Sequence, residues 1–226
     1  KFIVPVHFGG LSCEMDRIYE LKQEYGFYII EDASHAIGGQ FNDKMVGSCE
    51  FSDICIFSFH PVKIITTAEG GIATTQNEKL FSSMISLRSH GITRDPMQMM
   101  QSNLNQPWYY EQISLGLNYR MTDIHAALGI SQLKRLEKFI EKRNSLASRY
   151  RKKLEKFNIG LQYVPENIWS SYHLFVIRIL EGRSQNIRQK IFLDLRENNI
   201  NVNVHYIPIH LQPYYKNLLS YILRSS

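Results

Sequence analysis

The sequence has little cysteine and no long hydrophobic run. Its three cysteines, Cys13, Cys49 and Cys55, are an odd number and include no C-x-x-C pair. This argues against a disulfide-stapled secreted scaffold and indicates a reduced, cytoplasmic protein. No apolar run approaches the roughly 18–20 residues that span a bilayer, and no signal-peptide pattern opens the chain. We therefore expect a cytoplasmic protein without a membrane partner.

A glycine-rich dinucleotide loop is also absent. No G-x-G-x-x-G follows an expected strand, which disfavours a dehydrogenase-like dinucleotide binder. The excess of basic charge is small, because 26 Lys and Arg stand against 21 Asp and Glu for a net charge of +5. Most of this excess lies in residues 134–156, where basic residues alternate with glutamates as on a solvated helix face. We therefore expect no nucleic-acid partner.

What the chain has is enough apolar material for a real core. Of its 226 residues 44% are hydrophobic and 12% aromatic, which suits one large domain or two modest ones. An apolar run, FIVPVHF, begins directly after Lys1, and the sequence stops at YILRSS just after another apolar stretch. We therefore expect the sequence to be part of a longer chain, truncated at both ends.

Strand-like and helix-like segments alternate over residues 1–90. The strand-like segments are short and apolar on both faces. Between them, residues 15–25 and 79–88 have apolar side chains at the spacing of a helix. Such alternation predicts an α/β fold with a mostly parallel sheet covered by helices. The expected strands are residues 2–8, 27–32, 52–59 and 70–75.

The second half has a different organisation. Residues 92–120 are polar and predict a functional or interfacial loop. Thr122 is an N-cap residue, and the apolar stripe after it predicts one long helix to about Phe157. A small α+β lobe should follow, with a strand at 172–180, a helix at 185–197 and an extended segment at 201–210. The predicted divisions are a large domain over 1–121, a connecting helix over 122–157 and a partial small domain over 158–226.

The carboxyl ends of parallel strands are where ligands gather, and polar residues follow two of the expected strands there. Asp32 ends the strand 27–32 and suits a helix cap, a metal ligand or the partner of a cationic ligand. His35 follows it, but alone it suits an ordinary structural histidine. A metal site is disfavoured, because apart from His35 no other carboxylate or histidine lies at ligand spacing from Asp32.

The strand 52–59 has Ser58 near its end and is followed by His60 and Lys63. Lys63 stands among apolar residues, and desolvation of an amine lowers its pKa and makes it nucleophilic, as Schiff-base chemistry requires. The alternative is a lysine whose stem lies along a loop edge with its charge in water. Ser58 suits either a phosphate-binding hydroxyl or a strand-end serine. Together with Asp32, these residues are the parts of a pyridoxal 5'-phosphate (PLP) site.

Four motifs carry a family resemblance in their order and spacing. The sequence resembles the DegT/DnrJ/EryC1/StrS family of sugar-nucleotide aminotransferases in four motifs: EDASHAIGG, FSFHPVKIITTAEGG, LRSHG and LGLNYRMTDIHAALGISQLKRL. The resemblance covers nearly the whole chain, through VNVHYIPIHLQPYY. It implies the PLP-dependent transferase fold of aspartate aminotransferase (type I), with a mostly parallel sheet covered by helices and part of a small α+β C-terminal domain.

The resemblance also implies roles for the residues at the strand ends. Lys63 would hold pyridoxal 5'-phosphate covalently and then move a proton as base and acid. Asp32 would pair with the pyridinium nitrogen of the cofactor. His35 would lie beside the cofactor ring and its phenolic oxygen, and Ser58 would donate to the phosphate.

Further residues are implicated through the same resemblance. Asn118 would reach the phosphate of the neighbouring subunit's cofactor, so the active unit would be a homodimer with shared sites. The residues implied on the substrate side are Tyr119, Arg120, His205 and Tyr206.

The function that the resemblance implies is an amino transfer in nucleotide-sugar biosynthesis. L-glutamate would be the donor and C4 of a UDP-linked 4-keto-6-deoxy sugar the acceptor. The motifs SHAIG, HPVK with ITTAEGG, and RSHGITRD look most like members of pseudaminic acid biosynthesis. Open alternatives are an aminotransferase of the perosamine or 4-amino-arabinose type and a PLP-binding regulatory relative without turnover. The presence of Lys63 and Asp32 speaks against the latter.

Overall fold

The computed structural model of the chain describes residues 1–100, 106–180 and 185–224. The chain forms two compact units. The first comprises Lys1–Phe157 and Leu161–Ile177, and the second comprises Asn158–Gly160 with the residues from Arg178 onward. The three predicted divisions of the chain remain a prediction.

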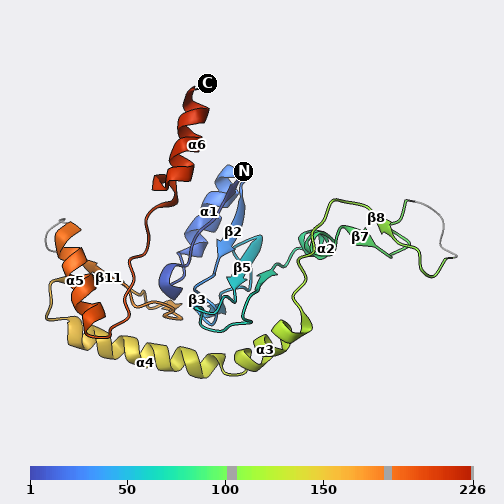
Figure 1. The fold of residues 1–226 in the computed structure, drawn as a ribbon. Coiled ribbons are helices and arrows are strands. Elements are labelled where there is room, and N and C mark those ends of the chain that lie inside the picture. Colours follow the sequence, from blue (N-terminus) through green and yellow to red (C-terminus); the bar gives the residue numbers. More distant parts are fainter. Residues whose placement is uncertain (101–105, 181–184, 225–226) are drawn as a thin grey trace. The chain divides into compact units, whose positions relative to one another are not determined.

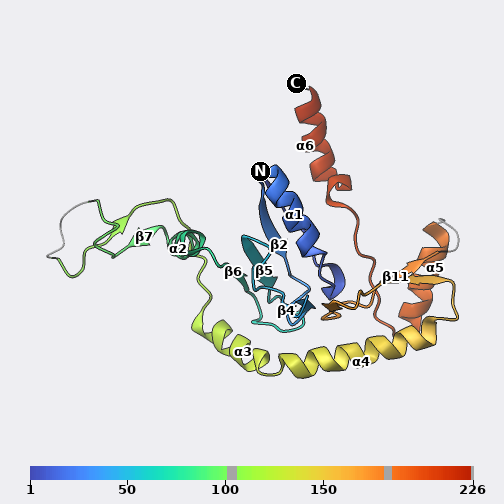
Figure 2. The same ribbon diagram turned by 180° about the vertical axis from the view of Figure 1, so that it is seen from behind.

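A four-stranded sheet in the first unit positions the candidate site (Figures 1 and 2). Its strand order is β1-β2-β5-β6, with β1 parallel to β2 and β2 parallel to β5. β6 runs antiparallel to β5 at the edge of this sheet. The strands are β1 (Phe2–Ile3), β2 (Tyr28–Asp32), β5 (Ile54–Ser58) and β6 (Gly71–Thr74). The mixed α/β architecture with parallel strands confirms the predicted fold class.

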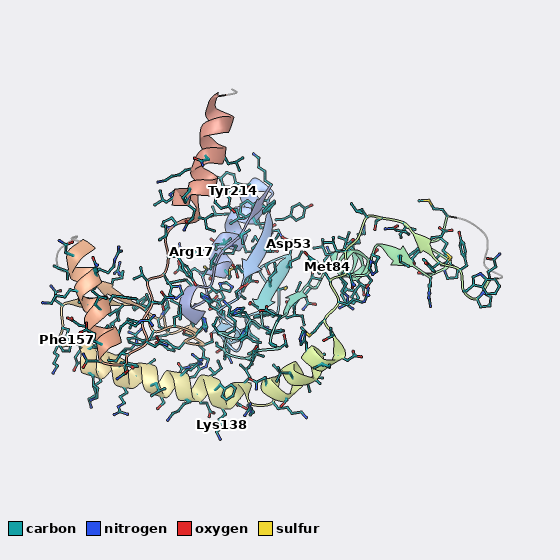
Figure 3. All side chains as sticks on the ribbon, in the orientation of Figure 1. Arg17, Asp53, Met84, Lys138, Phe157 and Tyr214 are labelled. Carbon is teal, nitrogen blue, oxygen red and sulfur yellow. The ribbon has the colours of Figure 1, made fainter. Side chains whose placement is uncertain are left out.

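Helix α1 (Met15–Tyr25) connects β1 to β2 and ends where predicted. Gly26 adopts a left-handed conformation at φ 66° and donates its N–H to the carbonyl of Lys22, which terminates the helix. Asp53, at the start of β5 (Figure 3), accepts from Lys22 Nζ at 2.8 Å and from the Ile29 N–H at 2.7 Å. One carboxylate therefore joins the helix to two strands of the sheet.

The core of the first unit consists of apolar clusters around this sheet. One cluster includes Met15, Ile29, Phe41 and Ile168, and another includes Ala33, Ala36, Cys49, Cys55 and Phe57. The three cysteines are free. A small antiparallel sheet of order β10-β3-β4 adds residues distant in sequence to the same unit. Its strands are β3 (Gln40–Phe41), β4 (Lys44–Met45) and β10 (Ile168–Trp169).

Helix α2 (Glu78–Leu87) begins at Asn77, whose side chain accepts from the N–H groups of Lys79 and Leu80. The segment predicted as a loop over 92–120 contains a strand pair, β7 (Ile92–Thr93) with β8 (Glu111–Gln112). Residues 101–105 of this segment lie outside the described residues.

The single long helix predicted from Thr122 is two helices. Thr122 caps α3 (Asp123–Leu133) as predicted, accepting from the His125 N–H, but α4 (Leu136–Leu154) begins after a break. Leu136 and Ile140 of α4 pack against the core, whereas Ile124 of α3 is 82% exposed. The predicted stripe is therefore buried in α4 and uncovered in α3, so one straight helix does not describe it. Lys138 lies on the exposed surface of α4 (Figure 3).

The remaining elements of the described chain are one strand pair, two 3₁₀ helices and the last two α-helices. β9 (Ile159–Leu161) pairs with β11 (Ile177–Ile179), so only the end of the predicted strand 172–180 forms. α5 (Gln185–Glu197) has the predicted bounds, and residues 201–208 are without helix or strand. Two 3₁₀ helices are η1 (Phe8–Gly10) and η2 (Ile209–Leu211). The last helix is α6 (Pro213–Arg224). No helix in the described parts of the chain has the length and apolar character to cross a membrane.

Candidate active site

The candidate site lies at the carboxyl ends of the parallel strands β2 and β5. Asp32 pairs with Ile56, and Ser58 follows Ile56 by two residues. Because side chains alternate along a strand, Asp32 and Ser58 share one face of the sheet, while Glu31 points to the opposite face. The structure thus brings the predicted carboxylate and hydroxyl to the same edge and the same face.

The backbone of Asp32 is tied to the chain before it. Its N–H donates to the Pro5 carbonyl at 2.9 Å, and its carbonyl accepts the His7 N–H at 3.1 Å. The carboxylate is half-buried, and Oδ1 accepts the Ser34 N–H at 3.0 Å. This last bond is the turn that the sequence alone also allowed, and it orients the carboxylate rather than neutralising it.

Lys63 lies on the loop after β5, directly before two buried isoleucines. The next two residues, Ile64 and Ile65, are 6% and 2% exposed, and the Lys63 N–H donates to the His60 carbonyl at 2.9 Å. Partial burial lowers the pKa of Lys63 below its usual value, and the charge of Asp32 acts in the opposite direction. Lys63 thus follows the strand that lies next to the one that Asp32 ends.

Ser58 lies between these two groups in sequence and is half-buried at the end of β5. Its Oγ accepts the His60 N–H at 3.4 Å. The hydroxyl retains its own proton for donation, since accepting a hydrogen bond uses only a lone pair. A donating hydroxyl at this edge suits an anionic group.

His35 lies on the loop after β2 and is also half-buried. The Gly9 N–H donates to His35 Nδ1 at 3.3 Å, so the ring proton of the neutral imidazole is assigned to Nε2. The ring packs near Phe8, with centroids 6.0 Å apart. Asp32, His35, Ser58 and Lys63 thus all belong to the strand ends of the first unit.

The remaining predicted residues belong to other segments of the chain. Asn118 forms an isolated antiparallel β-bridge with Ser89, and the Tyr119 N–H donates to the Arg88 carbonyl at 2.9 Å. This segment therefore runs beside the residues that follow α2. Asn118, Tyr119 and Arg120 are all exposed. His205 and Tyr206 belong to the second unit, where their rings are in edge contact at 4.1 Å.

A buried polar network behind Asp32 was missed by the sequence analysis. His7 is fully buried, and its Nε2 lies 2.7 Å from Glu31 Oε2. Ser52 Oγ donates to the other carboxylate oxygen of Glu31, and the Cys13 N–H donates to His7 Nδ1 at 3.1 Å. The signal for it was the Glu31–Asp32 pair, because two adjacent carboxylates at a strand end must point to opposite faces.

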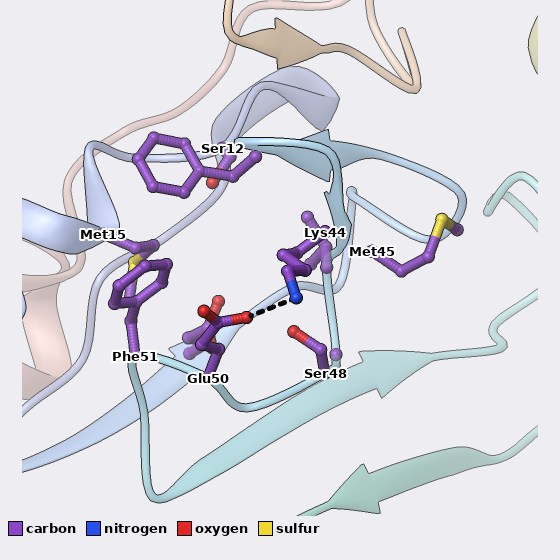
Figure 4. Close-up of a pocket in the computed structure, with 11 residues that line it drawn as sticks. Ser12, Met15, Lys44, Met45, Ser48, Glu50 and Phe51 are labelled. Atoms are coloured by element: carbon purple, nitrogen blue, oxygen red, sulfur yellow. Dashed lines mark ion pairs between the residues drawn. The ribbon is translucent and has the colours of Figure 1, made fainter.

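A small cavity lies on the Glu31 side of the sheet and not on the Asp32 side. It has a volume of about 20 Å³, room for about one water molecule. Figure 4 shows Lys44 and Glu50 at this cavity, paired at 3.4 Å, with Ser12 and Phe51 among the other lining residues. None of the predicted site residues lines it, so the cavity is separate from the candidate site.

We expect Glu31→Gln to lower the free energy of unfolding by about 1.5–3 kcal/mol, the range for a hydrogen bond to a charged group. The amide removes the charge that His7 faces while keeping the shape of the side chain. The measurement is urea denaturation. Glu50→Gln is the matched control, because its pair with Lys44 is exposed and should contribute less than about 1 kcal/mol. Equal effects of the two substitutions would contradict this account.

The chemistry of the site fits PLP. Asp32 supplies a carboxylate for a cationic ring nitrogen, Lys63 an amine for an aldehyde, and Ser58 and His35 supply donors for anionic oxygens. Among the described residues, no group of three or more His, Cys, Asp or Glu side chains is placed to hold a metal ion.

Similar proteins are known by sequence and by structure. The chain is 41% identical over 221 residues to UDP-4-amino-4,6-dideoxy-N-acetyl-beta-L-altrosamine transaminase of Campylobacter jejuni, which covers 97% of this chain and 55% of that protein. The putative sugar aminotransferase Spr1654 of Streptococcus pneumoniae, in its PMP form, superposes with a TM-score of 0.84 at 32% identity over 96% of this chain and 59% of its own.

A second similar solved structure comes from Helicobacter pylori. Helicobacter pylori PseC, an aminotransferase of pseudaminic acid biosynthesis, superposes with a TM-score of 0.83 at 30% identity, covering 96% of this chain and 56% of its own. Spr1654 was also solved in its PLP form. The chain spans about half the length of the curated relatives it matches. Residues 1–225 match one family throughout, and the chain belongs to the DegT/DnrJ/EryC1/StrS aminotransferase family.

Proposed function

We propose that the protein is a PLP-dependent aminotransferase that delivers an amino group, from L-glutamate, to C4 of a UDP-linked 4-keto-6-deoxy sugar in pseudaminic acid biosynthesis. The observation that carries the proposal is the placement of Asp32 at the carboxyl end of β2 and of Lys63 on the loop that follows the neighbouring parallel strand β5. Burial lowers the pKa of the Lys63 amine, which favours its reaction with an aldehyde.

PLP, when bound, supplies an aldehyde that condenses with amines and a pyridinium ring that stabilises negative charge on the adjacent carbon. Asp32 would hold the proton on the ring nitrogen. Lys63 would bind the cofactor and, once released, carry a proton on Nζ between two carbon atoms. Ser58 Oγ would donate to the phosphate, and His35 Nε2 would donate to the phenolic oxygen.

The choice of substrate is supported by relatives. A transaminase named for a UDP-linked amino sugar and a solved enzyme of pseudaminic acid biosynthesis both resemble nearly the whole chain. The test is to load the protein with its amino group and offer several nucleotide keto-sugars. Preferential discharge by the sugar of the pseudaminic acid pathway supports the proposal, and preferential discharge by a perosamine or 4-amino-arabinose precursor would replace it.

We also propose a homodimer with shared sites, located in the cytoplasm. Apolar side chains near Asn118 are exposed, among them Leu117 at 53%, Tyr119 at 75% and Ile124 at 82%. Such a surface suits a partner subunit, which Asn118 would enter to reach its cofactor phosphate. Substrate contacts would come from Tyr119, Arg120, His205 and Tyr206. Free cysteines are consistent with a reducing compartment.

The reactivity of Lys63 should depend on pH in a way that Asp32 controls. Burial lowers the pKa of Lys63 below the usual 10.5, so its neutral, reactive amine appears at lower pH than in an exposed lysine. Asp32→Asn removes a charge that favours the ammonium form and should lower the pKa of Lys63 further. The measurement is the rate of reductive methylation of Lys63 against pH, followed by mass spectrometry without cofactor.

Lys79 is the matched control, since it is exposed on α2. Its labelling rate should be the same in the unmodified and the Asp32→Asn proteins. A labelling profile of Lys63 that does not change in the Asp32→Asn protein would show that Asp32 does not control this amine.

A further inference from the structure

Residues Ser170–Leu174, here called the strap, form hydrogen bonds with η1 within the first unit. The Ser171 N–H donates to the Gly10 carbonyl at 2.9 Å, and the Leu174 N–H donates to the Gly9 carbonyl at 3.1 Å. Ser170 Oγ donates to the Gly10 carbonyl at 3.0 Å. Ser170 and Ser171 are 1% and 0% exposed, so these bonds lie in the interior.

The contact between strap and η1 requires a glycine. Gly10 has φ +99°, and a Cβ there would lie 2.5 Å from Ser171 Oγ and 2.8 Å from the Tyr172 nitrogen. Only glycine adopts this backbone conformation readily and allows the two chains to approach so closely. The close packing of the strap against η1 therefore depends on the glycine at position 10.

Helix α4 holds the strap from the other side. Arg143 Nη1 donates to the carbonyls of Tyr172 at 3.0 Å and His173 at 3.2 Å, and Asn144 Nδ2 donates to the Ser170 carbonyl at 3.0 Å. Arg143 is partly buried where it makes these bonds, and this burial lowers the pKa of its guanidinium. The strap is thus fixed between a helix and a loop.

What the strap touches next is the candidate site. Ser171 Oγ donates to the His35 carbonyl at 2.9 Å, and the His173 ring lies 4.5 Å from the His35 ring, centroid to centroid, at an angle of 41°. The Gly9 peptide links the two, because its carbonyl accepts from Leu174 of the strap while its N–H donates to His35 Nδ1.

We propose that His173 is a positioning residue, which holds the His35 imidazole in the orientation and Nε2–H tautomer that it presents at the candidate site. His173 packs against the ring itself, and the strap that carries it also holds the Gly9 peptide on His35 Nδ1. The contact stands on the structure alone, and only its consequence for the cofactor rests on the proposed function.

The test begins without cofactor, on uniformly ¹⁵N-labelled protein. In the unmodified protein, NMR should find His35 as the Nε2–H tautomer and the Gly9 amide protected from hydrogen exchange. In His173→Ala, the tautomers should mix and Gly9 exchange should accelerate about 2- to 10-fold, as expected for loss of an aromatic pair. His173→Phe keeps a ring at this place and should restore both signals. His210→Ala, an exposed histidine in the second unit, should change neither.

An unchanged His35 tautomer together with unchanged Gly9 exchange in His173→Ala would overturn the proposal. If that variant fails to fold, Ser171→Ala tests the same strap, and it should accelerate Gly9 exchange in the same sense; no acceleration there overturns the proposal as well. The dissociation constant for PLP should rise about 2- to 10-fold in His173→Ala and recover in His173→Phe. Altered NMR signals with unchanged PLP affinity would support the positioning role while removing His35 from the proposed cofactor site.

Discussion

Replacing Lys63 with alanine should lower transamination by at least about 10²–10⁴-fold, the range for loss of one positioned acid–base group. The amine has two tasks in the proposed function, since it binds the cofactor and carries the proton. Reduction with borohydride should attach PLP permanently to Lys63 in the unmodified protein, and mass spectrometry should find no label at position 63 of the variant.

Two further variants separate chemistry from charge. Lys63→Arg keeps a cation beside Asp32 but cannot condense with an aldehyde, because a guanidinium stays protonated. It should therefore be as inactive as Lys63→Ala. Lys79→Ala removes an exposed lysine and should keep full activity. Substantial turnover by Lys63→Arg would mean that the position contributes only charge, and the catalytic assignment would be wrong.

Asp32→Asn should lower turnover by about 10²-fold or more, similar to the loss of one preorganised group that stabilises transition-state charge. The amide keeps the shape of the side chain and can still accept the Ser34 N–H on its oxygen. It cannot balance the positive charge of a protonated ring nitrogen, so the effect should fall on kcat more than on folding. Steady-state kinetics and urea denaturation measure the two effects separately.

Asp43→Asn is the matched control for this substitution. Asp43 is exposed and has φ 59°, a left-handed conformation that asparagine also accepts. Its activity and stability should stay close to those of the unmodified protein. If Asp32→Asn lost stability while the kcat of its folded fraction was unchanged, Asp32 would be a structural turn residue, as the Ser34 bond by itself allows.

The local sequence pattern predicted the elements of the first unit well where the pattern is typical of a single type of structure. Gly26 stops α1, Thr122 caps α3, and short apolar runs became the parallel strands β2 and β5. It failed where packing decides. The stripe after Thr122 is continuous in sequence, but only its α4 part meets the core, and the helix breaks between Leu133 and Leu136.

The candidate site shows the same division. Asp32, Ser58 and Lys63 were predicted as site residues from their places in the strand pattern: Asp32 and Ser58 end strands, Lys63 follows one, and the two strands are neighbours. The His7–Glu31 pair and the His173–His35 contact had no comparable local signal. Each joins residues at least 24 positions apart, and neither partner stands in a pattern that requires the other.

Residue order alone determined which side chains stand at strand ends, because alternation of apolar segments and turn residues already specifies a parallel sheet and its carboxyl edge. Tertiary structure alone decided which of those side chains are desolvated, which neighbours hold them and in what orientation. Burial and contact depend on segments far apart in sequence, as when the strap contacts His35 and α4 contacts the strap. No spacing along the chain encodes those contacts.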